Sequence, residues 1–165
     1  MQSSRGFTLF ELLIVVALIT ILGGIALPSL TGSTARNSVW TASEGIGSQI
    51  RQARLKAISR NTRFRVRFNC PAVGQYRVLQ VTGDATIDND ADRCNTSQQY
   101  DSGIYSMPAN VNYGSTPPLL EVNGRGVYTS TTGIPTTITV TYTGPGSSSR
   151  SLIMSATGQI SFDIY

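Results

Sequence analysis

The 165-residue sequence contains no histidine, and this absence removes several kinds of active site. Histidine is the side chain whose charge changes most readily near neutral pH, and it is a frequent ligand of zinc. Its absence excludes His-based acid–base catalysis, His-activated nucleophiles and nearly all zinc sites. We therefore expect no catalytic residue, no metal site and no cofactor, and a protein that is not an enzyme.

Cysteine is also scarce, because the chain has only Cys70 and Cys94. Two cysteines cannot form a Cys-only metal site, and no CxxC pair is present for redox catalysis. A bond between them would close a loop of roughly 25 residues and stabilise the fold by about 3 kcal/mol. We predict this disulfide for a domain that faces an oxidising compartment.

Charge is almost absent from the first thirty residues. After a short polar leader (residues 1–6), Glu11 is the only ionisable side chain from Phe7 to Leu30. A helix over residues 7–30 would be roughly 36 Å long, enough to cross the hydrocarbon core of a bilayer. A carboxylate in such a segment is costly and needs a positive partner or a proton, so that Glu11 is a functional candidate. An ordinary secretory signal is not favoured, because the apolar run lacks a small-residue cleavage site.

The start of the chain carries a recognisable motif, which reads GFTLFELL over residues 6–13. With Pro28, it closely resembles the class III signal of type IV prepilins and type II secretion pseudopilins. The resemblance implies that a prepilin peptidase cleaves between Gly6 and Phe7 and methylates the new amino terminus. It also implies assembly roles for Glu11, which would pair with the amino group of Phe7, and for Pro28, which would kink the helix.

The same resemblance implies a location and partners. The chain would first lie in the bacterial inner membrane, crossing it once with its C-terminal domain in the periplasm. It would then enter a pilus at the cell surface, where other major and minor pilins are its partners. The periplasm is oxidising, which agrees with the predicted disulfide.

Beyond the apolar segment, the sequence predicts a second helical stretch over residues 35–60. Apolar side chains recur there at intervals of three and four residues, which forms one stripe on a helix. Residues 29–34 between the two segments are compatible with either a loop or weak helix. We expect Trp40, Leu55 and Ile58, which lie off the stripe, to widen the core face; contact with a neighbouring subunit is the alternative. The stripe consists of Val39, Ala42, Ile46, Ile50, Ala53 and Ala57.

The remainder of the chain predicts antiparallel strands. Residues 63–68 alternate strictly between arginine and apolar side chains, as in a strand buried on one face. Further strands are expected at 75–81, 119–122, 138–142, 151–155 and 160–164, separated by glycine-rich turns. Residues 84–92 hold four aspartates but lack the glycine and glutamate of an EF-hand loop, so we expect a solvated acidic loop.

The order of these segments adds to the resemblance. A helix that ends near Asn61, a strand directly after it and a closing strand–glycine–strand hairpin are similar to GspH/FimT-type minor pilins. The implied fold is α+β, with a long N-terminal helix, transmembrane in its first half, packed on a β-sandwich-like antiparallel domain. The implied organisation is a leader (1–6), a membrane or filament-core helix (7–30) and a periplasmic globular domain (31–165).

A basic cluster suggests phosphate binding as a second possibility. Seven positive side chains and no acidic one lie between residues 51 and 67. Such a cluster can hold phosphates, but it also suits a solvated face or a contact with another subunit. DNA-binding FimT-type pilins carry a Gly-Arg-x-Arg pattern, whereas the corresponding hairpin here reads Gly158-Gln159-Ile160-Ser161. The candidate DNA-binding residues are Arg51, Arg54, Lys56, Arg60, Arg63, Arg65, Arg67, Arg125 and Arg150.

Three functions follow from these features. The first is a FimU-like minor pilin that acts in pilus assembly, in priming or in the tip complex. The others are a DNA-binding minor pilin for natural transformation and a minor pseudopilin of a type II secretion system. All three share the fold and the processing signal, so the sequence alone does not separate them.

Overall fold

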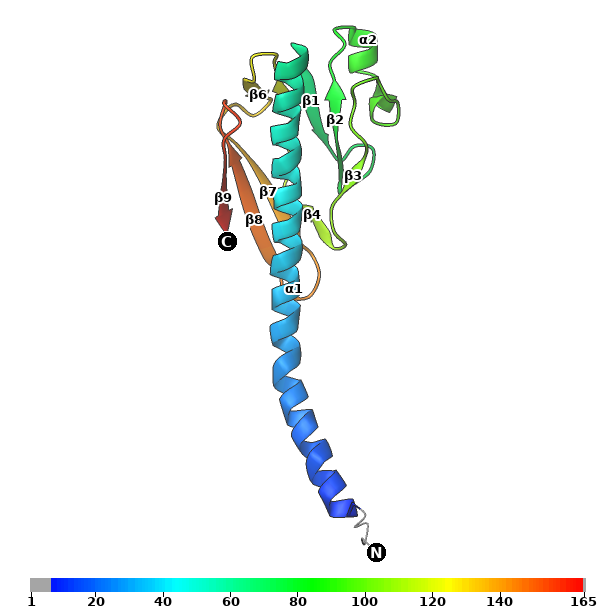
Figure 1. Ribbon diagram of the computed structural model, residues 1–165, viewed down its shortest axis with the longest axis vertical. Coiled ribbons are helices and arrows are strands. Elements are labelled where there is room, and N and C mark those ends of the chain that lie inside the picture. The colour runs from blue at the N-terminus through cyan, green and yellow to red at the C-terminus, as the bar shows by residue number, and fades with distance from the viewer. Residues whose placement is uncertain (1–6, 165) are drawn as a thin grey trace, which may run out of the picture.

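One long helix, α1 (Leu9–Arg60), forms the spine of the molecule (Figure 1). The computed structural model describes the backbone of residues 7–164 and the side chains of this range except 25–30, 91 and 164. Residues 29–34, for which the sequence left loop and helix open, are helical. Pro28 also lies within α1, and Figure 1 shows that the helix axis changes direction between its two halves.

The C-terminal end of α1 is set by a left-handed residue. Asn61 has φ 47° and ψ 42°, and its N–H donates to the carbonyl groups of Ala57 and Ile58. This conformation ends an α-helix by turning the chain away from the helix axis, and asparagine tolerates it better than most residues. The predicted helix end near Asn61 is confirmed.

Two antiparallel sheets follow the helix. The first sheet has the order β3-β2-β1-β5-β6, and the second sheet has the order β4-β7-β8-β9. In the first sheet, Val66 of β1 pairs with Val78 of β2 on one side and with Leu120 of β5 on the other. The strands of the first sheet are β1 (Phe64–Phe68), β2 (Gln75–Gln80), β3 (Tyr105–Ser106), β5 (Leu120–Val122) and β6 (Tyr128–Ser130). Those of the second are β4 (Val111–Tyr113), β7 (Thr136–Tyr142), β8 (Ser148–Met154) and β9 (Ile160–Ile164).

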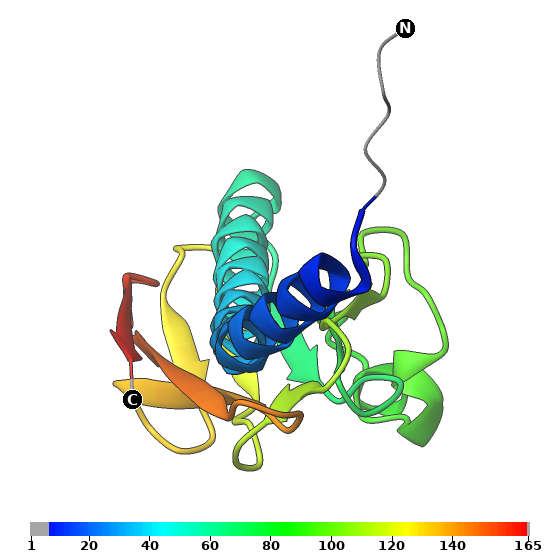
Figure 2. The same ribbon diagram turned by 90° about the horizontal axis from the view of Figure 1, so that it is seen from below.

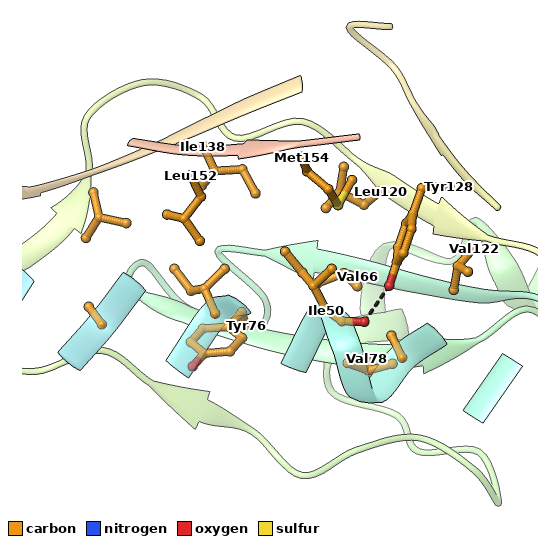
Figure 3. Packing of buried hydrophobic residues seen from close by; sticks show 14 of the residues in the cluster. Ile50, Val66, Tyr76, Val78, Leu120, Val122, Tyr128, Ile138, Leu152 and Met154 are labelled. Atoms are coloured by element: carbon orange, nitrogen blue, oxygen red, sulfur yellow. Dashed lines mark hydrogen bonds between the residues drawn. The ribbon is translucent and has the colours of Figure 1, made fainter. Parts of the chain in front are cut away.

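The C-terminal half of α1 lies across both sheets, as the view along the helix shows (Figure 2). All six residues of the predicted stripe are buried in one cluster with apolar side chains from both sheets. Figure 3 shows part of this cluster, with Ile50 as the labelled residue of the stripe. At the centre of this core, the hydroxyl of Tyr128 donates a hydrogen bond to the carbonyl of Ile50. The predicted α+β fold is therefore confirmed, with one shared core between the helix and the two sheets.

The expectation that Trp40, Leu55 and Ile58 widen the core face is wrong. Their exposed fractions are 48%, 67% and 46%, because they lie at the edges of the buried stripe, where Trp40 stacks on Arg150 of β8 without being enclosed. The sheets cover only a narrow stripe of the helix, and the flanking apolar side chains stay in solvent.

A long excursion joins β2 to β3 and folds back over the outer face of the first sheet. It contains α2 (Ala85–Asp88) and the short 3₁₀ helix η1 (Ala91–Cys94). The predicted disulfide between Cys70 and Cys94 is present, and both cysteines pack on Leu79 in a small separate cluster.

The acidic loop within this excursion is only partly as expected. The expected solvated state holds for Asp84, Asp90 and Asp92, which are exposed. Asp88 is instead buried and accepts hydrogen bonds from the N–H and hydroxyl groups of Thr82 and from the N–H of Gly83. These bonds fix the loop, because a buried carboxylate has to be fully hydrogen-bonded.

Within the described residues, no helix is both long enough and apolar enough to cross a membrane. The predicted membrane segment, residues 7–30, includes the six positions 25–30 whose side chains are not described, and it stays a prediction.

Candidate functional site

The N-terminal end of α1 is closed by two residues of the predicted signal. The hydroxyl of Thr8 accepts a hydrogen bond of 3.2 Å from the N–H of Glu11, and the N–H of Thr8 donates to Glu11 Oε2 at 3.5 Å. This reciprocal capping box satisfies two donors that a helix end otherwise leaves free. The helix predicted from residue 7 therefore starts at Leu9, as the Thr-x-x-Glu spacing in the sequence indicates.

Glu11 thus has a local structural task as well as the predicted assembly role. Its carboxylate lies at the positive end of the α1 dipole, where a negative charge is favourable. Phe7, the predicted first residue after processing, lies four positions before Glu11 and is 80% exposed. Gly6, the other half of the predicted cleavage site, lies outside the described residues.

The N-terminal half of α1 presents apolar side chains on every side. The described large hydrophobic side chains of residues 7–22 are at least 45% exposed, and the sheets contact only the C-terminal half of the helix. An apolar surface of this extent needs lipid or protein around it. The exposed residues are Phe7, Leu9, Phe10, Leu12, Leu13, Ile14, Val15, Val16, Leu18, Ile19, Ile21 and Leu22.

The fold divides the predicted basic cluster among several surfaces. One group lines a groove of about 420 Å³ between α1 and the turn that joins β8 to β9. Arg51, Arg54 and Leu55 form its helix side, and residues 157–159 form its turn side. We call this hollow the cationic groove.

A glycine makes the narrow turn of the cationic groove possible. Gly158 has φ +74°, which is unfavourable for other residues. A Cβ atom there would also lie 2.9 Å from the ring of Tyr128 and 3.3 Å from Cδ of Arg54. Gly158 therefore lets the turn approach α1 closely.

The turn between β5 and β6 adjoins the same region. Arg54 Nε donates a hydrogen bond of 3.0 Å to the carbonyl of Gly126, which positions the guanidinium beside the groove. Arg125 precedes this glycine and is exposed, and Val127 follows it and is exposed as well. The fold thus brings Arg125 to the same end of the molecule as Arg51 and Arg54.

A second group of cations lies on the strand that follows α1. Arg63 and Arg65 both form ion pairs with Glu121, at 3.1 and 3.2 Å, and Arg65 also donates to the carbonyl of Asp88. Burial lowers the pKa of Arg67, and the nearby Arg65 and Arg93 lower it further. Arg63 and Arg65 therefore make contacts within the domain.

Lys56 and Arg60 point to a third surface. They line a hollow of about 280 Å³ beside residues 99–101, where the Arg60 guanidinium lies 3.7 Å from the ring centre of Tyr100. The seven positive residues between 51 and 67 therefore do not form one continuous surface.

Arg150, which the sequence placed among the candidate DNA-binding residues, is only 5% exposed. Its guanidinium lies between the rings of Trp40 and Phe162, at 3.8 and 3.9 Å from their centres. It also donates to Ser43 Oγ at 2.7 Å and to Glu44 at 3.3 Å. The prediction for Arg150 is wrong, because an enclosed guanidinium cannot reach a DNA phosphate.

Two regions of the chain match known protein families. Residues 42–158 match the protein family described as type II transport protein GspH. Residues 1–27 match the prokaryotic N-terminal methylation motif, which coincides with the predicted processing signal.

Two individual proteins are similar to this chain. The pilin-like protein PilA1 of Thermus thermophilus is 32% identical over 102 residues, which are 62% of this chain and 56% of PilA1. The aligned region thus spans little more than half of that relative. The crystal structure of the type IV minor pilin FimU of Pseudomonas aeruginosa superposes with a TM-score of 0.51 at 17% identity, covering 78% of this chain and 90% of FimU. At this identity the likeness to FimU concerns the fold.

Proposed function

The chain belongs to the GspH family of type II transport proteins, and from this premise we propose that it acts as a minor pilin in the assembly or priming of a type IV pilus. The methylation motif and the likeness to PilA1 and FimU support a pilin role. The role is structural: the chain works by occupying a defined place among other pilins.

The proposed sequence of events begins with removal of residues 1–6. A prepilin peptidase cleaves after Gly6 and methylates the amino group of Phe7, while the apolar segment holds the precursor in the inner membrane. The processed subunit then leaves the lipid and enters the filament, where its N-terminal half packs among the helices of other pilins.

The observation that carries this proposal is the uncovered N-terminal half of α1. Its described side chains, those of residues 9–24, expose apolar groups on all sides of the helix, and Glu11 is the only ionisable residue from Phe7 to Leu30. A partner that covers this surface must supply apolar area along its length and a positive group near Glu11. The amino terminus of a processed pilin, on the same or the next subunit, meets the second requirement.

Replacement of Glu11 tests this role. In Glu11→Ala, we expect normal membrane insertion and leader removal, but incorporation into sheared filaments should fall at least about tenfold. The reason is that the amino group left without its carboxylate is an unpaired charge in an apolar environment, which costs several kcal/mol. Incorporation is measured by immunoblot of purified filaments against the membrane fraction.

Thr8→Ala is the matched control, because it removes the other half of the capping box and leaves the carboxylate in place. If Thr8→Ala lowers incorporation as much as Glu11→Ala does, then Glu11 acts only through the helix cap. Normal incorporation of Glu11→Ala would remove the proposed role of the carboxylate.

A second candidate is a minor pseudopilin of a type II secretion system, which the family description itself favours. The two roles differ in what fails when the gene is deleted. Loss of surface pili supports the pilus role, whereas intact pili together with retained secretion substrates in the periplasm support the pseudopilin role.

A further inference from the structure

The cationic groove has the composition of a protein-binding surface. Leu55 lies on its helix side and is 67% exposed, and the exposed Ile58 and Val127 lie at the same end of α1. The guanidinium of Arg51 makes no hydrogen bond and no ion pair with any described residue, and the residue is exposed. Exposed apolar side chains beside arginine are typical of the centres of protein interfaces. An occupant should therefore carry both acidic and apolar groups.

A segment with both kinds of group lies on the other side of α1 from the groove. Residues 84–92 present three exposed carboxylates, those of Asp84, Asp90 and Asp92, together with the half-buried Ile87. None of these three aspartates forms an ion pair with a described residue. The segment is also fixed in shape, because Asp88 is hydrogen-bonded to residues 82 and 83 and the disulfide fixes Cys94 to Cys70. Such a preformed loop loses little conformational entropy on binding.

The placement of the two surfaces allows a repeating contact. In both views, α2 and β9 lie on opposite sides of α1 (Figures 1 and 2). When rod-shaped subunits stand side by side with parallel helices, one side of each subunit faces the other side of its neighbour. This is a head-to-tail contact, in which the groove side of one copy meets the loop side of the next.

From these observations we propose that the cationic groove binds the acidic 84–92 loop of a second copy of this chain. The proposal rests on the pilin role argued above and adds a lateral contact between globular domains. Arg51 faces the carboxylates of the partner copy, and Leu55 contacts the apolar part of its loop. A nucleic acid would match the arginines but not the exposed apolar side chains, and the described residues that line the groove include no aromatic ring for base stacking.

A charge-swap experiment on the processed full-length chain in detergent micelles tests this contact. Self-association is measured by sedimentation at two salt concentrations. Arg51→Glu and Asp92→Arg should each weaken it about tenfold, since close opposite charges at interfaces couple by more than 1.4 kcal/mol. The double variant should regain most of the affinity, and the wild-type interaction should weaken at higher salt. Arg36→Glu is the control, because it makes the same charge change on α1 outside the groove.

Photo-crosslinking locates the contact. A benzophenone amino acid in place of Leu55 should crosslink to residues 84–92 of another copy, as identified by mass spectrometry of the crosslinked peptide. The same probe in place of Val73, which is exposed in the β1–β2 turn, should not crosslink to this segment.

Several outcomes overturn the proposal. They are unchanged self-association in both single variants, no recovery in the double variant, or a Leu55 crosslink to a different segment or a different pilin. Binding of duplex DNA that Arg51→Glu abolishes, without self-association, would assign the groove to DNA instead. A chain that fails these tests but still requires Glu11 to enter filaments leaves the proposed pilin role standing.

Discussion

Arginine side chains have three different environments in this domain. Arg150 is enclosed between two aromatic rings, Arg93 forms a buried ion pair with Asp101, and Arg51 is exposed beside an apolar groove. Only the last environment leaves a cation available to a partner. In the sequence the three residues look alike, because burial of an arginine depends on which aromatic and acidic side chains the fold brings around it.

Asp101 gives the domain a defined response to acid. Burial alone would raise the pKa of Asp101, but hydrogen bonds from Arg93 and from the N–H groups of Gln98 and Gln80 outweigh it and hold the pKa below its usual value. A depressed pKa in the folded state means that the stabilisation is complete above pH about 4 and is lost as the pH falls through the folded-state pKa.

We therefore expect Asp101→Asn to destabilise the domain at pH 7 by about 3 kcal/mol, because Arg93 would be left as a buried, uncompensated charge. The stability difference between pH 7 and pH 3 should become smaller in this variant. Urea unfolding followed by circular dichroism at both pH values measures this. Asp92→Asn is the control, as this carboxylate is exposed, and an equal loss in both variants would contradict the prediction.

Among the helices and strands, the sequence predicted those whose apolar residues recur with a clear period. The apolar stripe of α1, the alternation in β1 and the strands β2, β5, β7, β8 and β9 are all present, with boundaries shifted by up to three residues. The strands β3, β4 and β6 and the helices α2 and η1 were missed. Each has at most four residues, so that no alternation or helical period develops within it.

The sequence predicted the processing signal but not the cationic groove. The processing signal is contiguous in sequence and was readable, whereas the cationic groove combines α1 with a turn about a hundred residues later. Leu55, which lines the groove, and the nearby Ile58 were assigned to the core, because an apolar residue beside a buried stripe has no sequence feature that marks it as exposed.

The Cys70–Cys94 disulfide joins the β2–β3 excursion to the turn between β1 and β2. The bond closes a loop with a sequence separation of 24 residues, for which the chain-entropy account gives about 3 kcal/mol. We expect the free energy of unfolding of the Cys70→Ser/Cys94→Ser variant to be lower than that of the wild type by about this amount. Its amide hydrogens over residues 82–103 should exchange faster, while those of β7 and β8 change little.

Wild-type protein treated with a reductant is the matched comparison and should behave like the double variant. Unchanged exchange over residues 82–103 in both samples would show that Asp88 and the Arg93–Asp101 pair suffice to order the excursion.

In the whole molecule, the two halves of α1 have different environments. Its C-terminal half completes the core of the domain, and its N-terminal half contributes nothing to that core within the described residues. Folding of the domain and burial of the apolar half are therefore separate events, and the second depends on partners. Removal of the leader is the proposed step between the membrane-held precursor and the assembling subunit.

Gly6→Leu should block this step, because the peptidase requires a small residue before the cleaved bond. The intact mass of the purified chain should then retain residues 1–6 and lack the N-terminal methyl group. Ser4→Leu, which places the same side chain two positions away, should be processed normally. A mature mass from Gly6→Leu would contradict the assignment of the processing signal.

The stacking of Trp40 on Arg150 has one practical consequence. Trp40 is the only tryptophan in the chain, and its ring lies over a guanidinium that belongs to the second sheet. Whenever this sheet separates from α1, the indole loses that neighbour and its surroundings change. The intrinsic fluorescence of the unlabelled chain is therefore a built-in optical signal for the attachment of the second sheet to the helix.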